Sequence, residues 1–371
     1  MIENLNMFSN KKNLIFLLPN FAQGGAGLST LKLCKSISYK NFNNYVISLG
    51  KNYYKSNFEK INFKVIELHP KSLLSSIKTI KRFINDVTKK NNKKTYLISN
   101  INYANALSCL FFRNIYKLKI ITIDRTPIQE LEHHSSIIKF FKNIIIKILI
   151  KFFYKYAFIR IGNSVPVSED LEKFCKSEVK TITPFIDINK KKLKKFNKPK
   201  LNLTWIGRIS PEKNIDDILN AVCFLNKVNF QLNIVSDKKV NLDNFKIDEK
   251  IRKNITLFRF NKVDLVKIYK KSDILISTSL YEGFPNVIAE AINYNCLIIS
   301  AKNFGGARQL IGGGDKGIYY NLNNPQDLSK KIKYSFENKN LIKKKIYKSK
   351  KNLIKLSKLY NNSYKNLFDR L

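Results

Sequence analysis

Two glutamates that stand eight positions apart are the residues of this sequence best suited to chemistry. Glu282 and Glu290 enclose a Gly-Phe-Pro-Asn turn that follows the predicted strand 274–278. Proline is pre-shaped for the first position of a helix, so we expect a helix to begin at Pro285. The free N–H groups of that helix would favour a phosphate, and carboxylates beside it would accept hydrogen bonds from sugar hydroxyls.

A basic group follows another predicted strand. Gly207 and Arg208 come directly after the predicted strand 201–206, and Lys213 precedes a predicted helix. In a parallel sheet these side chains would lie at the carboxyl ends of the strands, where α/β sheets bind ligands. An Arg and a Lys at that edge suit a diphosphate in the absence of a metal ion.

Alternating strands and helices are predicted to position both groups. In the first half the predicted strands are 14–18, 45–49, 64–68, 96–99 and 119–123, and the helices are 28–38 and 73–87. In the second half the predicted strands are 201–206, 230–235, 274–278 and 296–300, and the helices are 215–225, 265–272 and 285–293. This alternation is typical of α/β folds whose parallel sheets are covered on both faces.

The length of 371 residues exceeds what one hydrophobic core holds, so two domains are expected. The Lys-rich segment 189–200 is the predicted linker. We therefore predict domains at 1–188 and 189–345, followed by a helical tail at 346–371 that could cross back to the first domain.

Together these motifs resemble the GT4 family of retaining glycosyltransferases. The family's hallmark, two glutamates separated by seven residues, matches Glu282 and Glu290. Its G-R-x-x-x-E-K stretch matches residues 207–213, and further similarity covers Gly24-Gly25, 164–171, Gly305-Gly306 and Gly317. The resemblance implies the GT-B fold, in which two Rossmann-like domains with parallel sheets face each other across a cleft.

The resemblance also implies roles for individual residues. Arg208 and Lys213 would hold the donor diphosphate, Glu282 would contact the donor sugar, and Glu290 the ribose hydroxyls. The implied catalytic residues are Glu282, Arg208, Lys213 and Arg125. The other implied donor-binding positions are Gly24, Gly25, Gly207, Gly283, Phe284, Pro285, Asn286 and Val287, with Gly24 and Gly25 approaching from the first domain.

The implied reaction moves a sugar from a UDP- or GDP-linked donor to a saccharide or lipid-linked acceptor, in surface polysaccharide or glycolipid synthesis. A leaving phosphate oxygen would accept the acceptor's proton on the same face. No protein nucleophile, cofactor or metal ion is therefore expected, and a two-carboxylate glycosidase mechanism is not implied.

Two departures from the family pattern leave alternatives open. Many members place a His after the fourth or fifth strand, where this chain has Asp124 and Arg125. Either Arg125 replaces that His and contacts donor or acceptor, or Asp124 and Arg125 pair with each other in a loop. The usual Gly-x-Gly of the nucleotide domain is replaced by residues 235–238, so recognition of the base stays open.

Histidine and cysteine give little sign of a metal site. His133-His134 could bind a metal or an acceptor, but only three His exist, and a solvated loop or helix start is preferred. Five Cys at 34, 109, 175, 223 and 296 are scattered without a C-x-x-C pair, and they are interpreted as buried thiols in a reducing compartment.

The net charge of +41 requires its own explanation. Only nine of the 68 basic residues are Arg, whereas nucleic-acid recognition favours Arg. We attribute the lysines first to compositional drift and second to attraction by an anionic membrane. No apolar run reaches the 18 residues needed to span a bilayer, so we expect a cytoplasmic protein that could lie at the inner face of the cell membrane.

The segment 137–159 is apolar almost all round, with Lys147, Lys151 and Lys155 on one helix face. It is either an interfacial helix on an acidic membrane or a core helix packed on the sheet, and the core helix is the preferred interpretation. For the whole chain, the rival functions are a same-fold sugar-nucleotide epimerase or phosphorylase, a basic nucleic-acid-binding or membrane-binding protein, and an inactive relative. The joint order and spacing of the motifs favour the glycosyltransferase.

Overall fold

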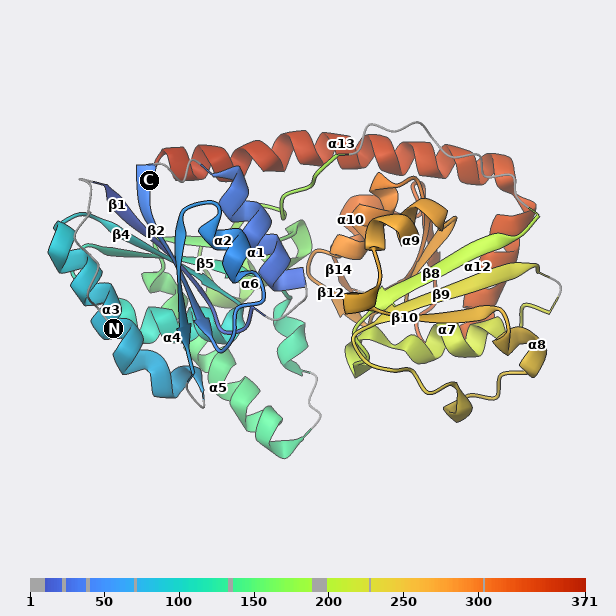
Figure 1. Ribbon diagram of the computed structural model, residues 1–371, viewed down its shortest axis with the longest axis horizontal. Helices are drawn as coiled ribbons and strands as arrows, with labels where there is room; N and C mark the ends of the chain where they lie inside the picture. Colours follow the sequence, from blue (N-terminus) through green and yellow to red (C-terminus); the bar gives the residue numbers. More distant parts are fainter. Residues whose placement is uncertain are drawn as a thin grey trace. The chain divides into compact units, whose positions relative to one another are not determined.

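A computed structural model describes residues 11–21, 25–37, 41–69, 72–132, 136–188, 199–226, 228–302 and 304–371 (Figure 1). The chain divides into two compact units. Unit 1 comprises Met1–Phe185 and Leu359–Leu371, and unit 2 comprises Ile186–Lys358. The predictions on Gly24, on His133-His134 and on most of the linker 189–200 lie outside the described residues.

Unit 1 contains a sheet of seven strands in the order β3-β2-β1-β4-β5-β6-β7, and all neighbouring strands are parallel. The strands are β1 (Lys12–Leu18), β2 (Phe42–Leu49), β3 (Phe63–Leu68), β4 (Thr95–Asn100), β5 (Leu118–Asp124), β6 (Ile159–Gly162) and β7 (Lys180–Thr181). The helices are α1 (Gly25–Ser36), α2 (Lys55–Glu59), α3 (Leu73–Asn91), α4 (Asn102–Phe112), η2 (Ile128–Glu132), α5 (Ile137–Phe153), η3 (Tyr154–Tyr156) and α6 (Val165–Cys175).

Both faces of this sheet are buried, which explains the continuous apolar runs of its strands. Ile15 and Leu17 of β1 point into a core formed with α3, α4 and one side of α5. Phe16, which alternates with them, points into a second core formed with α1 and α2. The period of two along the strand therefore assigns each side chain to one of the two helical layers.

Unit 2 repeats this plan with six parallel strands in the order β10-β9-β8-β11-β13-β15. The strands are β8 (Leu201–Gly207), β9 (Phe230–Ser236), β10 (Ile255–Arg259), β11 (Ile274–Ser277), β13 (Leu297–Ala301) and β15 (Ile318–Tyr320), and the short pair β12 (Tyr281–Glu282) and β14 (Phe304–Gly305) stands apart. The helices are η4 (Pro211–Lys213), α7 (Ile215–Val222), η5 (Leu242–Asn244), α8 (Glu249–Arg252), η6 (Phe260–Lys262), α9 (Leu265–Lys271), α10 (Asn286–Asn293), α11 (Ala307–Ile311), α12 (Pro325–Glu337) and α13 (Lys339–Asp369).

The two parallel sheets confirm the predicted α/β class. One local prediction is wrong: Pro285 is the residue before α10 and not its first helical residue, with φ −77° and ψ 89°. Proline is tolerated at this cap position because the N–H that it lacks would have no intrahelical partner there, and α10 begins directly after it.

The preferred interpretation of the segment 137–159, a core helix packed on the sheet, holds for one side of the helix only: Ile146 and Ile150 lie in a core of unit 1. Within this segment α5 packs on α4, η2 and α6, and only Asn143, Ile146 and Ile150 of the helix are buried. Its other large apolar side chains are largely exposed. No helix in the described ranges is long and apolar enough to cross a membrane.

All five cysteines are free thiols. Cys34, Cys109, Cys175 and Cys296 are buried, and Cys223 is half-buried. Burial raises the pKa of each buried thiol for which a shift is resolved, including Cys34 and Cys109, so these groups behave as small apolar side chains.

The last helix contributes to both units. Ile342 and Ile346 of α13 lie in one core of unit 2, whereas Tyr364 and Phe368 lie in a core of unit 1. The carbonyl oxygen of Leu371 accepts hydrogen bonds from the Tyr96 hydroxyl and the Lys12 ammonium, both at 2.6 Å. The end of α13 is thus part of the interior of unit 1.

We predict that Phe368→Ala lowers the free energy of unfolding of unit 1 by roughly 3–5 kcal/mol, as truncation of a buried Phe does. Phe368 is 2% exposed and its ring lies 6.4 Å from that of Phe16. Leu359→Ala is the matched control in the same helix, because Leu359 is 57% exposed. Equal shifts of the thermal midpoint in the two variants would contradict the packing of α13 into unit 1.

Candidate functional site

Glu282 lies at the centre of a polar cluster in unit 2. Its Oε1 accepts a hydrogen bond from Lys213 Nζ at 2.5 Å and another from Ser279 Oγ at 2.8 Å. The side chains of Lys213 and Glu282 are 22% and 14% exposed, so water screens this ion pair only partly. The carboxylate is therefore held in a defined position at the carboxyl ends of β8 and β11.

The turn that carries Glu282 depends on close backbone contact with two glycines. In the two-stranded pairing of β12 with β14, Glu282 is the register partner of Gly305. A Cβ on Gly305 would lie 1.9 Å from the Glu282 carbonyl oxygen, and one on Gly306 would lie 2.3 Å from the Gly283 carbonyl oxygen. The Gly306 N–H also donates to the Gly283 oxygen at 2.9 Å.

Lys213 is positioned by a chain of hydrogen bonds from the sheet. The indole N–H of Trp205 donates to the Thr278 hydroxyl at 2.9 Å, and that hydroxyl donates to the Lys213 carbonyl oxygen at 2.6 Å. The Trp205 ring needs the absence of a side chain at Gly207, where a Cβ would lie 2.8 Å from it. The buried Trp205 thereby links the ends of β8 and β11.

Arg208 comes from the same connection between β8 and α7 but is far more exposed than Lys213. Its Nη2 donates to Glu212 Oε1 at 3.0 Å, and its side chain is 64% exposed. The backbone of Glu212 is itself fixed, because its carbonyl oxygen accepts from the Leu280 N–H at 2.9 Å. An exposed Arg of this kind can turn toward an anion at little cost, since exposed ion pairs are weak.

Glu290 lies in α10, eight residues after Glu282 and about one turn from the start of the helix. Its Oε2 accepts a hydrogen bond from the Tyr269 hydroxyl at 2.9 Å. The Tyr269 ring is 2% exposed and stacks on Tyr294 with a 4° interplanar angle, which fixes the donor. Burial and the neighbouring Glu290 carboxylate raise the pKa of the Tyr269 hydroxyl, so it remains a donor.

Both ends of α10 are defined. At its start, the first intrahelical bond is made by Ile288 N–H to the Pro285 oxygen, so the N–H groups of Asn286 and Val287 precede the helical ladder. At its end, the Lys350 ammonium donates to the Asn293 carbonyl oxygen at 2.6 Å. A cation at the carboxyl end complements the helix dipole, whose positive end lies next to the turn that carries Glu282.

The arrangement in unit 2 suits an anion that carries hydroxyl groups. Lys213, Arg208 and the amino end of α10 supply positive charge and N–H donors. Glu282 and Glu290 supply carboxylate acceptors on either side of that helix start. A phosphate next to sugar hydroxyls has this combination of charges and donors.

Arg125 lies at the carboxyl ends of the strands of unit 1. Its Nη2 donates to the Thr30 hydroxyl at 3.0 Å and to Asn100 Oδ1 at 2.9 Å, and its carbonyl oxygen accepts from Asn163 Nδ2 at 2.9 Å. Burial lowers the pKa of the guanidinium. The alternative in which Arg125 pairs with Asp124 is wrong, because the two side chains bond to different partners.

Asp124 faces the interior of unit 1. Its Oδ1 accepts a hydrogen bond from the Tyr154 hydroxyl at 2.8 Å, and the residue is 1% exposed. Burial raises the pKa of this carboxyl to about 7, although the Tyr154 hydrogen bond acts in the opposite direction. The hydrogen bond from Tyr154 to Asp124 therefore fixes the end of β5, next to Arg125.

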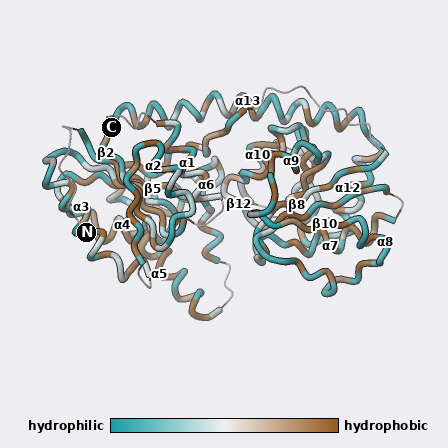
Figure 2. Tube along the Cα trace, in the orientation of Figure 1, coloured by the Kyte–Doolittle hydropathy of each residue, from teal (hydrophilic) through white to brown (hydrophobic). Residues whose placement is uncertain are grey.

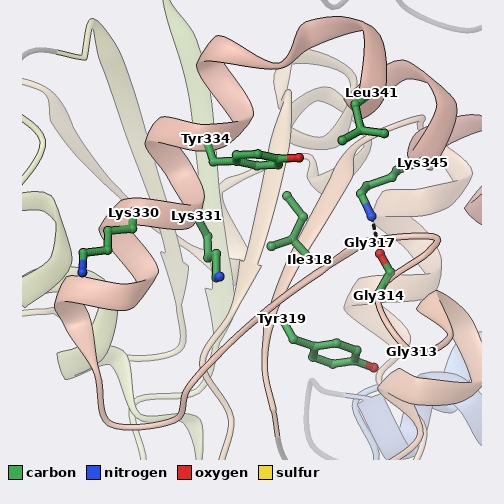
Figure 3. Close-up of a pocket in the computed structure, with 10 residues that line it drawn as sticks. All are labelled: Gly313, Gly314, Gly317, Ile318, Tyr319, Lys330, Lys331, Tyr334, Leu341 and Lys345. Atoms are coloured by element: carbon green, nitrogen blue, oxygen red, sulfur yellow. Dashed lines mark hydrogen bonds between the residues drawn. The ribbon is translucent and has the colours of Figure 1, made fainter.

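A separate hollow of about 530 Å³ lies elsewhere in unit 2 (Figure 3). It is lined by the loop at Gly313-Gly314, the start of β15, and side chains of α12 and α13 including Lys331, Tyr334 and Lys345. The loop enters β15 at its amino end, which is the edge of a parallel sheet opposite to that of Glu282. We therefore do not place the phosphate-binding group there. Within the described ranges, no group of three or more His, Cys, Asp or Glu side chains could hold a metal ion.

The structure brings together most of the predicted residues of unit 2. Lys213, Glu282 and Gly283 meet in one cluster, and Phe284, Pro285, Asn286 and Val287 lead from it into α10. Gly25 is the first residue of α1 in unit 1. Some residues that bond to the site were not predicted from the sequence. They are Thr278, Ser279 and Tyr269 in unit 2, and Thr30 and Asn100 in unit 1. A hydroxyl or amide residue just after a strand was the only signal available for Ser279 and Asn100.

We predict that Gly305→Ala destabilises unit 2 by at least about 1–3 kcal/mol, because φ is +145° and the added methyl would overlap the Glu282 carbonyl. Gly313→Ala is the matched control, since a Cβ there meets nothing within 4 Å. Thermal unfolding of both variants measures the difference. A Gly305→Ala midpoint equal to that of Gly313→Ala would refute the close contact.

For Asp124 we predict a pH-dependent stability that Asp124→Asn removes. The folded pKa of about 7 lies above the ordinary aspartate value of 3.8, so the folded state keeps a proton that the unfolded chain releases. The stability that this group contributes is complete below the pKa of the unfolded chain. As the pH rises it falls by up to about 1.4 kcal/mol per pH unit, until the pH exceeds the pKa of the folded state. The free energy of unfolding of Asp124→Asn relative to the parent should therefore increase with pH between these two pKa values and then become constant. A difference that does not depend on pH would contradict the burial of the carboxyl.

Part of the chain matches a known protein family. Residues 185–352 match the family model described as glycosyl transferases group 1. This range includes the Lys213, Glu282 and Glu290 groups and covers most of unit 2.

Among curated proteins, the chain is 24% identical over 187 residues to an uncharacterised glycosyltransferase of Methanocaldococcus jannaschii, covering 49% of this chain and 52% of the relative. It is 28% identical over 143 residues to an α-1,4-N-acetyl-D-galactosaminyltransferase of Campylobacter jejuni that acts on a GalNAc-GalNAc-diNAcBac-PP-undecaprenol, covering 37% and 39%. The match thus spans about half, or less, of the length of these relatives.

Among solved structures, Anabaena HepE in complex with UDP and glucose has a TM-score of 0.73 to this chain at 16% identity. The match covers 95% of this chain and 99% of HepE, and it establishes the GT-B fold. Residues 185–352 are therefore similar to the glycosyl transferases group 1 family, and the chain has the GT-B fold.

Proposed function

We propose that this chain is a retaining glycosyltransferase that moves a sugar from a nucleotide-sugar donor to a saccharide or lipid-linked acceptor. One observation carries the proposal: Glu282 is held by Lys213 and Ser279 next to the amino end of α10. A carboxylate, a cation and free N–H donors then surround one place at the carboxyl edge of the unit 2 sheet, where α/β sheets bind their ligands.

Each group has a role in this proposal. The donor diphosphate binds the amino end of α10, Lys213 and Arg208. Glu290, oriented by Tyr269, accepts hydrogen bonds from the ribose hydroxyls, and Glu282 accepts from the donor sugar. Diphosphate binding draws the Lys213 ammonium toward a phosphate oxygen, and this weakens its pairing with Glu282. Arg125 serves the donor sugar or the acceptor from unit 1.

The reaction follows from where charge develops. As the bond from the sugar carbon to the diphosphate oxygen breaks, negative charge grows on the leaving diphosphate. Lys213, Arg208 and the helix amino end stabilise that charge in place of a metal ion. The acceptor hydroxyl forms the new bond on the same face of the sugar and passes its proton to a phosphate oxygen, so the anomeric configuration is retained.

The donor and acceptor are proposed by analogy to the relatives. UDP is favoured over GDP because HepE binds UDP, and a lipid-linked acceptor is favoured because the Campylobacter relative acts on an undecaprenol-linked glycan. Transfer to such an acceptor would take place at the inner face of the cell membrane, in surface polysaccharide or glycolipid synthesis.

Transfer from a panel of UDP- and GDP-sugars to saccharide and polyprenol-linked acceptors tests the proposal. Glu282→Gln, Lys213→Met and Arg208→Ala should each lower kcat by about 10²–10³-fold, as loss of one charge-stabilising contact does. Arg252→Ala is the control, because it removes another partly exposed Arg of unit 2 that lies outside the cluster. Chelation of divalent metals should leave the rate unchanged.

Several outcomes would contradict the proposal. Full activity of Glu282→Gln would remove Glu282 from the site, and an inverted product in the anomeric NMR spectrum would exclude retention. A sugar nucleotide that is epimerised without transfer would identify the enzyme as an epimerase of the same fold.

A further inference from the structure

Helix α5 presents a row of large apolar side chains to solvent. Its buried residues are Asn143, Ile146 and Ile150, which recur at helical spacing along one side. The opposite side, at positions i, i+4, i+8, i+11 and i+15, carries only apolar residues that are 48–76% exposed. These five residues, here called the α5 apolar face, are Ile137, Phe141, Ile145, Ile148 and Phe152.

An ordinary surface helix buries its apolar side and exposes a polar side, whereas α5 is apolar on its exposed side as well as at Ile146 and Ile150 on its buried side. Here the amide of Asn143 points inward, where it is 5% exposed and donates to the Leu131 carbonyl oxygen at 3.2 Å. The first turns of α5 project beyond the other elements of unit 1 (Figure 1), and its hydrophobic residues can be followed in Figure 2. Contiguous exposed apolar patches of this kind mark interaction sites.

Lysines border the α5 apolar face. On the helical wheel Lys147 and Lys151 lie along one border and Lys142 along the other, between the buried and the exposed sides. Lys147 pairs with Glu132 at 3.0 Å. The chain has no Asp or Glu between Glu132 and Glu169, so Lys142 and Lys151 give the borders of the face a net positive charge. Long lysine stems can lie along apolar surface while their ammonium groups reach a polar layer.

Aromatic residues extend the surface beyond the end of α5. Tyr156 and Phe158 are 47% and 49% exposed. The Arg113 guanidinium lies over the Tyr156 ring at 4.8 Å and over the Phe153 ring at 4.9 Å. Amphipathic aromatic rings beside basic groups are suited to the boundary between water and lipid.

We propose that α5 is a docking surface for an anionic lipid bilayer. The apolar face enters the boundary between headgroups and acyl chains, and the bordering lysines meet lipid phosphates. With 17 residues the helix is about 25 Å long and lies in the plane of the membrane surface. Such a bilayer supplies both an apolar layer and a negative layer, which matches the two properties of this surface.

A second copy of the chain fits this surface less well. Two α5 helices packed face to face would bring their lysine borders together. Glu132 already pairs with Lys147 of its own chain, and the sequence between Glu132 and Glu169 has no acidic side chain to pair with Lys142 or Lys151. Like charges placed opposite each other at an interface disfavour association.

Docking through α5 would also place the enzyme close to a lipid-linked acceptor. In unit 1, η2 connects the end of β5, where Arg125 lies, to the start of α5, so Arg125 precedes Ile137 by twelve positions. This use of the surface rests on the proposed function, whereas binding to lipid does not.

Co-sedimentation with vesicles of phosphatidylcholine, with and without phosphatidylglycerol, tests the proposal. The chain should bind the anionic vesicles at low salt and bind less at high salt. The triple variant Phe141→Gln, Ile145→Gln, Phe152→Gln should lose most of this binding. A second variant, Lys142→Gln, Lys151→Gln, Lys155→Gln, should weaken it by at least about tenfold.

The matched control is Tyr53→Gln, Leu74→Gln, Leu359→Gln, which changes three side chains of similar exposure (56%, 60% and 57%) elsewhere on the protein. It should bind as the parent does. Circular dichroism checks that each variant is folded, and hydrolysis of a soluble donor should be unchanged in all of them, which separates docking from donor chemistry. The proposal is overturned if the parent ignores anionic vesicles at low salt, if the α5 triple variant binds like the control, or if α5 instead mediates a dimer without lipid binding.

Discussion

Close contact between two backbone segments is the constraint on which the candidate site depends. The turn at Glu282-Gly283 lies against Gly305 and Gly306, at a separation that leaves no space for a Cβ. This contact fixes the direction of the Glu282 side chain, and it fixes where α10 begins. The positions of Lys213, through its ion pair, and of Glu290, one helix turn further on from the start of α10, follow from it. Rigid backbone rather than flexible side chains therefore sets the distances between charges.

The sequence predicted the frame of the site because parallel strands buried on both faces are continuous apolar runs. β1 and β11 lie within a few residues of their predicted positions for this reason. The short strands β12 and β14 were not predicted, since a two-residue strand has no periodicity. Their pairing is a long-range contact that depends on the absence of side chains at Gly305 and Gly306. Motif spacing identified Glu282 and Lys213, but only the structure gives their ion pair.

The same limits explain where the predictions for unit 1 differed from the structure. The apolar content of α5 was compatible with a core helix or an interfacial helix, because periodicity does not reveal which side of a helix is covered. The buried Asn143 is the feature that distinguishes the two, and its burial depends on contacts with η2. Similarly, Asp124 and Arg125 are neighbours in sequence, but successive residues of a strand point to opposite sides of the sheet. Asp124 therefore bonds to Tyr154, and Arg125 bonds to Asn100.

The central claim is that unit 2 binds a nucleoside diphosphate at the edge that carries Lys213 and Glu282. A crystal structure of the chain with UDP, grown without divalent metal, tests this most directly. The account predicts the diphosphate against the amino end of α10 and within hydrogen-bonding distance of Lys213 Nζ, with the ribose beside Glu290. A diphosphate bound instead in the hollow at the start of β15, or at any place away from α10, would contradict it.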